Sequence, residues 1–410
     1  QKIPHLDPTK PIEERIDLLM QQMTLEEKVG QMNQYNGFWD VTGPVPSDGD
    51  ASQKYENLRK GLVGSMLNVT GVEEVRKIQK IAVEESRLGI PLIIGFDMIH
   101  GMKTMSPIPL AEAASWDMEA IKQSSRIGAR EAAAMGVNWT FAPMVDVGRD
   151  ARWGRVMEGA GEDTYLNSQI AVARVQGYQG EDLSDPLTIA ACVKHFAGYG
   201  FSESGRDYNT VDVGTTTLYN VILPPFKAAL DAGARTFMNS FNDLNGIPAT
   251  GNDFLQRDIL KGKWNFSGFV VSDWGSISEM IPHGFAQDGK MAAKYAANAG
   301  SDMDMESYLY IKHLKELVES GEVKESIIDD AVRRILRVKF ELGLFDDPYR
   351  YCNEEREKEI VGSTDHQAGV LEMAKKSIVL LKNEENILPL AKSGLKIAVI
   401  GSLAADKDSP

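Results

Sequence analysis

The sequence predicts an α/β protein: a (β/α)₈ barrel of the TIM type, followed by the start of a second α/β sandwich domain. Three observations support this prediction. Short apolar runs alternate with longer amphipathic stretches, about eight such pairs fit within residues 1–346, and polar residues stand where several of the apolar runs end. A doubly wound open sheet is the alternative, because periodicity alone does not show that a sheet closes.

The predicted strands are short strand-like runs, and the predicted helices are the longer amphipathic stretches between them. In chain order the strands are QMNQY near 31, LVGSML near 62, PLIIGFD near 91, NWTFAP near 138, ACVKHFAG near 191, TFMNSF near 236, GFVVSD near 268 and AGSDMDM near 299. Helical patterns such as VEEVRKIQKIAVEESRLG have apolar residues at every third or fourth position. Thr24 and Glu27 predict a capping box at the start of the first helix.

The texture of the sequence changes after the predicted helix IIDDAVRRILRVKFELGLF. We expect the catalytic barrel to occupy residues 1–346, a polar linker residues 347–376, and the beginning of a second α/β domain residues 377–410. The last of these contains GLKIAVIGS, which reads as a buried strand ending in a glycine turn. The rest of that second domain is expected to be missing from this chain.

The composition excludes several classes of protein. The 410 residues carry a net charge of −15, which disfavours nucleic acid and anionic membranes as partners. Cys192 and Cys352 are the only cysteines, so neither a disulfide framework nor a zinc site is expected. No stretch of the sequence is apolar enough to predict a spanning helix. We expect no metal ion, no cofactor and no insertion into a membrane.

Polar residues follow the ends of several predicted strands. In a parallel barrel these ends open at one mouth, where catalytic groups gather. A single such residue reads equally well as a helix cap or half of a buried ion pair, but residues at five strand ends together favour a site. They are Asp97 and His100; Asp146, Arg149, Arg152 and Arg155; Lys194 and His195; Met238 and Asn239; Asp273 and Trp274.

The residue types at this mouth suit a carbohydrate. Carboxylates and cations bind rings of hydroxyl groups, and Trp274 offers an apolar face for the C–H side of a sugar. No glycine-rich loop of the kind that holds phosphate is convincing. One rival remains on residues alone: a class I aldolase-like barrel in which Lys194 forms a Schiff base.

Three motifs, KHFAGYG, RDARWGR and VVSDWGS, together resemble glycoside hydrolase family 3, in particular its bacterial periplasmic β-glucosidase branch. The resemblance extends from LLMQQMTLEEKVGQM to IVLLKNEENILPL. It implies that Asp273 is the nucleophile of a retaining exo-β-glycosidase, which removes terminal β-D-glucosyl residues from short β-glucosides through a covalent glycosyl-enzyme. It also implies a periplasmic or secreted location. The start at Gln1 fits a removed leader peptide as well as a cut in the chain.

The resemblance also implies the residues that bind substrate. Asp97 and Arg155 are expected at the far end of the sugar ring, and Lys194 and His195 on neighbouring hydroxyls. Met238 is expected to line the pocket, and Trp274 to stack on the sugar at its rim. Glu203 is expected to approach the nucleophile or the loop that contacts the aglycone.

The sequence departs from relatives in one loop and leaves the general acid/base unassigned. The loop GYGFSESGRDYN holds no histidine, which disfavours the family's N-acetylglucosamine specificity. In the glucosidase branch the acid/base is usually a glutamate of the second domain, so we expect the missing domain or a companion chain to supply it. Glu203 and Glu158 are the nearby alternatives. A homodimer is compatible with the sequence, which does not set the oligomeric state.

Two alternative functions stay open beside the β-glucosidase. One is a carbohydrate-binding barrel without turnover, and the other is a different β-glycosidase specificity, either β-xylosidase or exo-glucanase. Structural roles are expected for the other polar residues at strand ends: His100 fixing its loop, Arg149 and Arg152 in ion pairs with Asp146 or Glu158, and Asp302 and Asp304 supporting the barrel.

Overall fold

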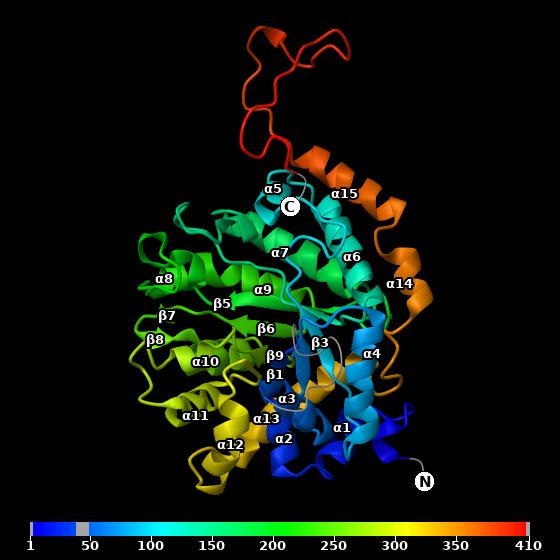
Figure 1. The fold of residues 1–410 in the computed structure, drawn as a ribbon. Coiled ribbons are helices and arrows are strands. Elements are labelled where there is room, and N and C mark those ends of the chain that lie inside the picture. The colour runs from blue at the N-terminus through cyan, green and yellow to red at the C-terminus, as the bar shows by residue number, and fades with distance from the viewer. Residues whose placement is uncertain (1–2, 38–48, 407–410) are drawn as a thin grey trace.

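The computed structural model describes residues 3–37 and 49–406, and its centre is a ring of eight parallel strands (Figure 1). Each strand overlaps one of the eight predicted runs, so all eight strand predictions are confirmed. In ring order the strands are β1 (Asn33–Asn36), β2 (Ser65–Leu67), β3 (Ile93–Phe96), β4 (Trp139–Thr140), β5 (Ala190–Phe196), β6 (Thr236–Asn239), β9 (Phe269–Val271) and β10 (Asp304–Met305). Outside the ring, β7 (Asp243–Leu244) and β8 (Ile247–Pro248) form an antiparallel hairpin.

The ring closes between β9 and the residues that lead into β10. Val271 forms a parallel bridge with Met303, and β10 pairs in parallel with β1. The peptide N–H groups of Asp302 and Met303 also donate to the carbonyl of Val270. The sheet is therefore a barrel, and the open doubly wound alternative is excluded.

At least one helical segment follows every strand of the ring, and α13 contacts α1 and α2 so that the last barrel helix lies beside the first ones. After β6 this segment is η8 (Phe254–Lys263). The α-helices are α1 (Ile12–Met20), α2 (Leu25–Gln31), α3 (Gly49–Arg59), α4 (Val72–Lys80), α5 (Pro109–Ala113), α6 (Met118–Ala134), α7 (Thr164–Gln179), α8 (Thr215–Thr217), α9 (Leu223–Asp231), α10 (Ser276–Glu279), α11 (Gly289–Ala299), α12 (Leu309–Glu319), α13 (Glu325–Glu341), α14 (Glu354–Ile360) and α15 (Thr364–Ser377).

Side chains fill the centre of the barrel. Trp139 on β4 is fully buried, and its indole Nε1 donates a hydrogen bond of 2.8 Å to Oγ1 of Thr236 on β6. Phe141 and Phe269 contact the same indole edge-to-face at centroid distances of 4.8 and 5.2 Å. This packing joins three strands that are far apart in the sequence, and it gives the mouth a rigid floor.

The predicted capping box is confirmed. Oγ1 of Thr24 accepts a hydrogen bond of 3.2 Å from the peptide N–H of Glu27, and the Glu27 carboxylate accepts one of 2.9 Å from the N–H of Thr24. Two N–H groups that would otherwise lack partners at the start of α2 are thereby satisfied.

The segment expected to be a linker is helical and packs on the barrel. Figure 1 shows α14 and α15 running along the outside of the molecule beside α6, which both helices contact. One buried carboxylate fastens them: Oε1 of Glu131 on α6 accepts from the peptide N–H of Gly362 (2.9 Å) and lies 3.0 Å from Nδ1 of His366.

Residues 378–406 extend away from the barrel in Figure 1. The buried strand expected in GLKIAVIGS is not formed among these residues: Ile397, Val399 and Ile400 are 69%, 74% and 89% exposed. A strand needs a neighbour for its N–H and C=O groups and a face to bury, and the described chain offers neither to this segment. The second domain itself stays a prediction.

Candidate active site

The predicted site residues come from the carboxyl ends of neighbouring strands. Asp97 directly follows β3, Lys194 and His195 lie near the end of β5, and Asp273 stands two residues beyond β9. Because the strands are parallel, these ends open at one mouth. Close contacts join the four residues in two pairs, Lys194 with Asp97 and His195 with Asp273.

Lys194 is a buried cation that reaches toward the open mouth. Its side chain is 2% exposed, and Nζ donates a hydrogen bond of 2.9 Å to Oδ1 of Asp97, whose side chain is 50% exposed. Burial is the largest influence and by itself would lower the pKa of Lys194, but the carboxylates of Asp97 and Glu158 together raise that pKa above its ordinary value. The amine therefore stays protonated and acts as a hydrogen-bond donor.

Asp273 is a buried carboxylate with one oxygen held and one oxygen unpaired. Oδ1 accepts a hydrogen bond of 2.6 Å from the peptide N–H of Trp274. Oδ2 has no hydrogen-bond partner among the described residues, and it lies 3.6 Å from Nε2 of His195. Burial raises the pKa of Asp273 to about 6, although Lys194 and Arg155 pull it down. At neutral pH most of this group is therefore ionised.

A turn places Asp273 at the mouth. Gly275 adopts φ 67°, a left-handed conformation that favours glycine, and lets the chain leave β9 and start α10 at once. Trp274 remains 44% exposed at this turn. An ionised carboxylate and an aromatic face thus stand side by side.

Arg155 is fixed by a two-pronged ion pair. Its Nε and Nη2 donate hydrogen bonds of 2.7 and 2.9 Å to the two carboxylate oxygens of Glu158, and its guanidinium lies 5.6 Å from the ring centroid of Tyr199. Burial by itself would lower the pKa of Arg155, but the hydrogen bonds to Glu158 and the charge of Glu158 raise it above its ordinary value. Arg155 is therefore a permanent positive charge that favours the ionised form of Asp273.

The other two arginines of this loop brace it, with partners that differ from those predicted. Arg152 pairs with Asp150 at 2.6 Å on the exposed surface, and the guanidinium of Arg149 lies 5.7 Å from the ring centroid of Phe201. Asp146, expected to hold one of them, instead lies 2.8 Å from His195 Nδ1. Asp146 lies in the loop after β4 and His195 lies on β5, so the order of residues within that loop does not reveal this contact.

Aromatic side chains form one wall of the mouth. Tyr199 lies 5.1 Å from Trp153 and 5.2 Å from His195 between ring centroids, and Tyr208 lies 4.6 Å from Phe241. Tyr208 is 48% exposed. With Trp274 it presents apolar faces to solvent near the carboxylates, which suits the C–H face of a sugar or an aromatic aglycone.

Two predicted substrate residues lie outside these contacts. Met238 on β6 is buried in the main hydrophobic core, and Glu203 is exposed on a short turn of 3₁₀-helix. The roles of both stay predictions.

Three structural roles are confirmed. Nδ1 of His100 lies 2.8 Å from the carbonyl of Ser106. Asp302 accepts hydrogen bonds from Lys261 Nζ and the Val270 peptide N–H. Asp304 accepts from the peptide N–H groups of Ser307, Leu309 and Tyr310 at the start of α12.

One carboxyl of this region was missed from the sequence. Glu279, at the end of α10, has a pKa raised to about 7 by burial and by the charge of Asp273. The sequence did contain a signal for Glu279: this residue lies six positions beyond Asp273, on the helix that begins after the Gly275 turn. Only the structure shows that this helix brings the two carboxyls into electrostatic contact.

The described residues include no group of three or more His, Cys, Asp or Glu side chains that could hold a metal ion. Among the helices of the described chain, none has the length and apolar character needed to cross a membrane.

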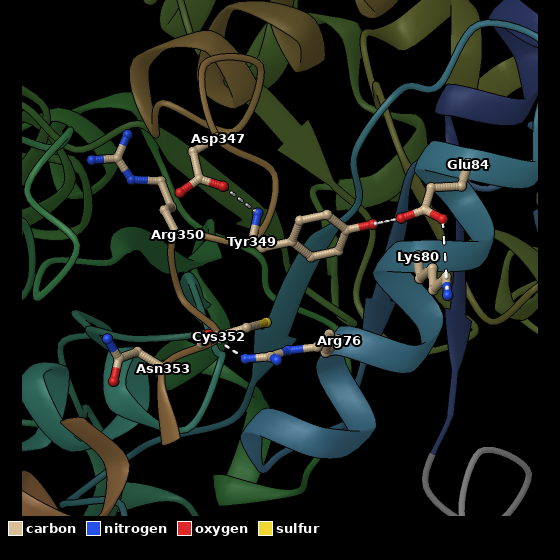
Figure 2. Close-up of a pocket in the computed structure, with 8 residues that line it drawn as sticks. All are labelled: Arg76, Lys80, Glu84, Asp347, Tyr349, Arg350, Cys352 and Asn353. Carbon is tan, nitrogen blue, oxygen red and sulfur yellow. Dashed lines mark hydrogen bonds and ion pairs between the residues drawn. The ribbon is translucent and has the colours of Figure 1, made fainter. Parts of the chain in front are cut away.

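A cavity of about 550 Å³ lies elsewhere, between α4 and the segment 347–353 (Figure 2). Two pairs of its polar groups bind one another: Tyr349 donates from its hydroxyl to Glu84 at 2.7 Å, and Arg76 donates to the carbonyl of Cys352 at 2.6 Å. None of the predicted site residues lines it. The barrel mouth therefore remains the candidate active site.

Comparison with known proteins agrees with this geometry. A family model described as the glycosyl hydrolase family 3 N terminal domain matches residues 24–338. A periplasmic beta-glucosidase of Salmonella typhimurium is 42% identical over 94% of this chain and 50% of its own length, and a putative beta-xylosidase of Formosa agariphila is 36% identical over 96% and 54%. The chain thus spans about half the length of these relatives.

Solved structures show the same fold. A beta-glucosidase from Listeria innocua in complex with isofagomine superposes with a TM-score of 0.86 at 42% identity, covering 92% of this chain and 53% of that one. The same enzyme in complex with glucose gives a TM-score of 0.87 at 41% identity, with the same coverage.

Proposed function

The chain belongs to glycosyl hydrolase family 3, and from that premise we propose that it acts as a retaining exo-β-glycosidase. Its substrates are short β-glucosides, from which it releases the terminal non-reducing β-D-glucosyl residue. One observation carries the proposal: the carboxylate of Asp273 stands at the barrel mouth with Oδ2 unpaired among the described residues, under the positive charges of Lys194 and Arg155 and next in sequence to the exposed Trp274.

In the first step Oδ2 of Asp273 attacks the anomeric carbon, the bond from that carbon to the leaving oxygen breaks, and the leaving oxygen takes a proton from a general acid. In the second step the general acid of the first step, now deprotonated, acts as a base and takes a proton from water. The water oxygen attacks the anomeric carbon, and the bond from that carbon to Asp273 breaks. Two inversions give net retention. Lys194 and Arg155 support the ionised nucleophile, since both pull the pKa of Asp273 down.

The general acid/base comes from a second domain or a companion chain in this proposal. Within the barrel, Glu158 has both oxygens bound by Arg155, and Glu203 is exposed on its turn. Glu279 holds a proton near neutral pH and is the remaining carboxyl to test.

Glucose is favoured over xylose as the sugar. The relative from Salmonella typhimurium and the Listeria innocua structures carry the name beta-glucosidase, whereas β-xylosidase is the name of more distant relatives at 36% and 35% identity. The same Salmonella relative is named periplasmic, which supports a periplasmic or secreted location for this protein.

The aldolase-like rival is disfavoured. A Schiff-base lysine must lose its proton, and a lowered pKa is what makes this easy. The pKa of Lys194 is instead raised: burial lowers it, but the negative charges of Asp97 and Glu158, with the hydrogen bond from Nζ to Asp97, outweigh burial.

The proposal is tested by following turnover of dinitrophenyl β-glucoside with proton NMR. We expect β-glucose to be the first product, before mutarotation mixes the anomers. Asp273→Asn should abolish turnover, and Asp150→Asn, which removes an exposed carboxylate beside Arg152, should not. Glucose binding without any turnover would support the carbohydrate-binding barrel instead, and α-glucose as first product would exclude retention.

A further inference from the structure

Asp146 is a buried carboxylate that holds His195 through two contacts. It follows β4, is 3% exposed, and has Oδ2 as acceptor for the peptide N–H of His195 at 2.9 Å. The same oxygen lies 2.8 Å from Nδ1 of the His195 ring. Oδ1 is buried and has no hydrogen-bond partner among the described residues.

These contacts decide which ring nitrogen carries the proton. Burial raises the pKa of Asp146 to about 7, although the hydrogen bond from the peptide N–H of His195 lowers it. Above that pH the carboxylate is ionised and its Oδ2 can only accept hydrogen bonds, so Nδ1 must donate, and the neutral ring then has a bare Nε2. The ring is neutral because burial, with the positive charges of Arg155 and Lys194, holds the pKa of His195 well below its ordinary value. The charged groups that face Asp146 are Arg155, Lys194 and Glu158.

The bare nitrogen faces the nucleophile. Nε2 of His195 lies 3.6 Å from Oδ2 of Asp273, and Oδ2 accepts no hydrogen bond from the described residues. Two acceptors stand opposite each other with no hydrogen between them. In the other tautomer Nε2–H would donate to Oδ2, which would lower the pKa of Asp273 and occupy the lone pair that attacks the sugar.

We propose that Asp146 is a positioning residue: it fixes the Nδ1–H tautomer of His195, so that Nε2 accepts a hydrogen bond from a substrate hydroxyl and leaves Oδ2 of Asp273 undonated. The inference rests on the proposed function, since it assigns the nucleophile to Asp273. The hydroxyl is the one nearest the anomeric carbon, because Nε2 lies beside the oxygen that attacks that carbon. A substrate that lacks this hydroxyl leaves both acceptors unpaired.

The test reads the tautomer directly by ¹⁵N NMR of protein labelled in its six histidines. His195→Gln assigns the signals of the ring. In the free wild-type protein above pH 7 we expect a protonated Nδ1 and a bare Nε2. In Asp146→Ala the Nδ1–H loses its acceptor, so the proton should move to Nε2, opposite Asp273. A wild-type ring protonated at Nε2 would overturn the inference without any variant.

Kinetics separate positioning from simple structural support. Asp146→Asn keeps an oxygen that accepts both N–H groups, so it should preserve the tautomer and stay within about 10-fold of wild-type kcat. Asp146→Ala should lower kcat by on the order of 100-fold, the scale for partners that orient a functional histidine. In a His195→Ala background the same change should cost less than about 3-fold, because its effect passes through the ring.

Equal losses in the two backgrounds, or an unchanged tautomer in Asp146→Ala, would contradict the role of Asp146. The failure of the proposed function looks different: no turnover and no retention, whatever the tautomer of His195.

Discussion

At the scale of single residues, the site holds two cations near the Asp273 carboxylate and leaves its Oδ2 without a hydrogen-bond partner among the described residues. Asp273 is ionised at neutral pH although it is 8% exposed, because Lys194 and Arg155 partly offset the cost of burial. Their own charges are secured by Asp97 and Glu158. The charge of Asp273 therefore depends on these four neighbours rather than on its own strand.

Lys194→Met tests this dependence. Removing the positive charge should raise the pKa of Asp273 above about 6, so the acidic limb of kcat/KM, which reports the free enzyme, should move to higher pH. Arg152→Gln removes an exposed cation that is paired with Asp150 and should leave the limb in place. A limb that moves to lower pH in Lys194→Met would contradict the electrostatic account.

Glu279→Gln tests whether the acid lies in this chain. If a separate domain or chain supplies the acid, the variant should lose a similar, small factor on dinitrophenyl and on alkyl β-glucosides. A true general acid contributes about 10²–10⁴-fold, and only on poor leaving groups. A loss confined to alkyl glucosides would identify Glu279 as the acid.

At the scale of elements, the ends of the ring strands position the site residues, and one buried carboxylate, that of Glu131, links the elements around the site. Glu131 on α6 accepts from the loop after β3, through the peptide N–H groups of Lys103 and Thr104, and also from Gly362 ahead of α15. Burial alone would raise its pKa, but the hydrogen bonds from Thr104, Gly362 and His366 outweigh it and lower the pKa of Glu131. The β3 loop and α15 are thus joined through one side chain.

Glu131→Ala should destabilise the protein by on the order of 2–3 kcal/mol, the scale of hydrogen bonds to a charged group. A lowered folded-state pKa means that the stabilisation exists above the unfolded-state pKa and is lost as pH falls. Urea unfolding should therefore show the wild type and the variant converging in acid. Glu372→Ala, an exposed change on α15, is the control and should leave the unfolding midpoint unchanged. A constant difference at all pH values would argue against the charge.

The secondary-structure elements also show which parts of the fold could be predicted from the sequence. Each ring strand lies in a short strand-like run between two helical patterns, so all eight were predictable, even β1, whose sequence NQYN is polar. The hairpin of β7 and β8 was missed although Asn245-Gly246 between them is a strong turn signal. The partner of Asp146, His195 on β5, was not predictable, because it is set by which strand ends become neighbours when the barrel closes. The partner of Arg152 is Asp150, two residues away in the same loop, and this local pair was missed.

At the scale of the whole molecule, the barrel and residues 378–406 behave as separate parts. Closure between Val271 and Met303 joins distant segments, and no local pattern in the sequence indicates it. The opposite error arose in GLKIAVIGS, where an apolar run predicted a buried strand and the described chain leaves it exposed. A local pattern indicates what a segment can form, and only its neighbours decide whether it does so.

Ending the chain at Ser377 should therefore leave barrel stability almost unchanged. Nearly all of residues 378–406 are exposed, and this segment extends away from the barrel (Figure 1), so its loss removes little buried area. Calorimetry of the two chains should give midpoints within about 2 °C, since a loss of 1 kcal/mol in a large domain moves the midpoint by about 2–4 °C. A much lower midpoint would mean that this segment packs on the barrel in solution.

The central claim is that Asp273 is the nucleophile, and covalent labelling tests it most directly. The protein is incubated with dinitrophenyl 2-deoxy-2-fluoro-β-glucoside, whose leaving group departs without an acid and whose fluorine slows release of the sugar, and its peptides are then mapped by mass. We predict one fluoroglucosyl group on the peptide that contains Asp273, and none in Asp273→Asn. A label on any other carboxylate, or a folded chain that binds glucose and takes no label, would contradict the account.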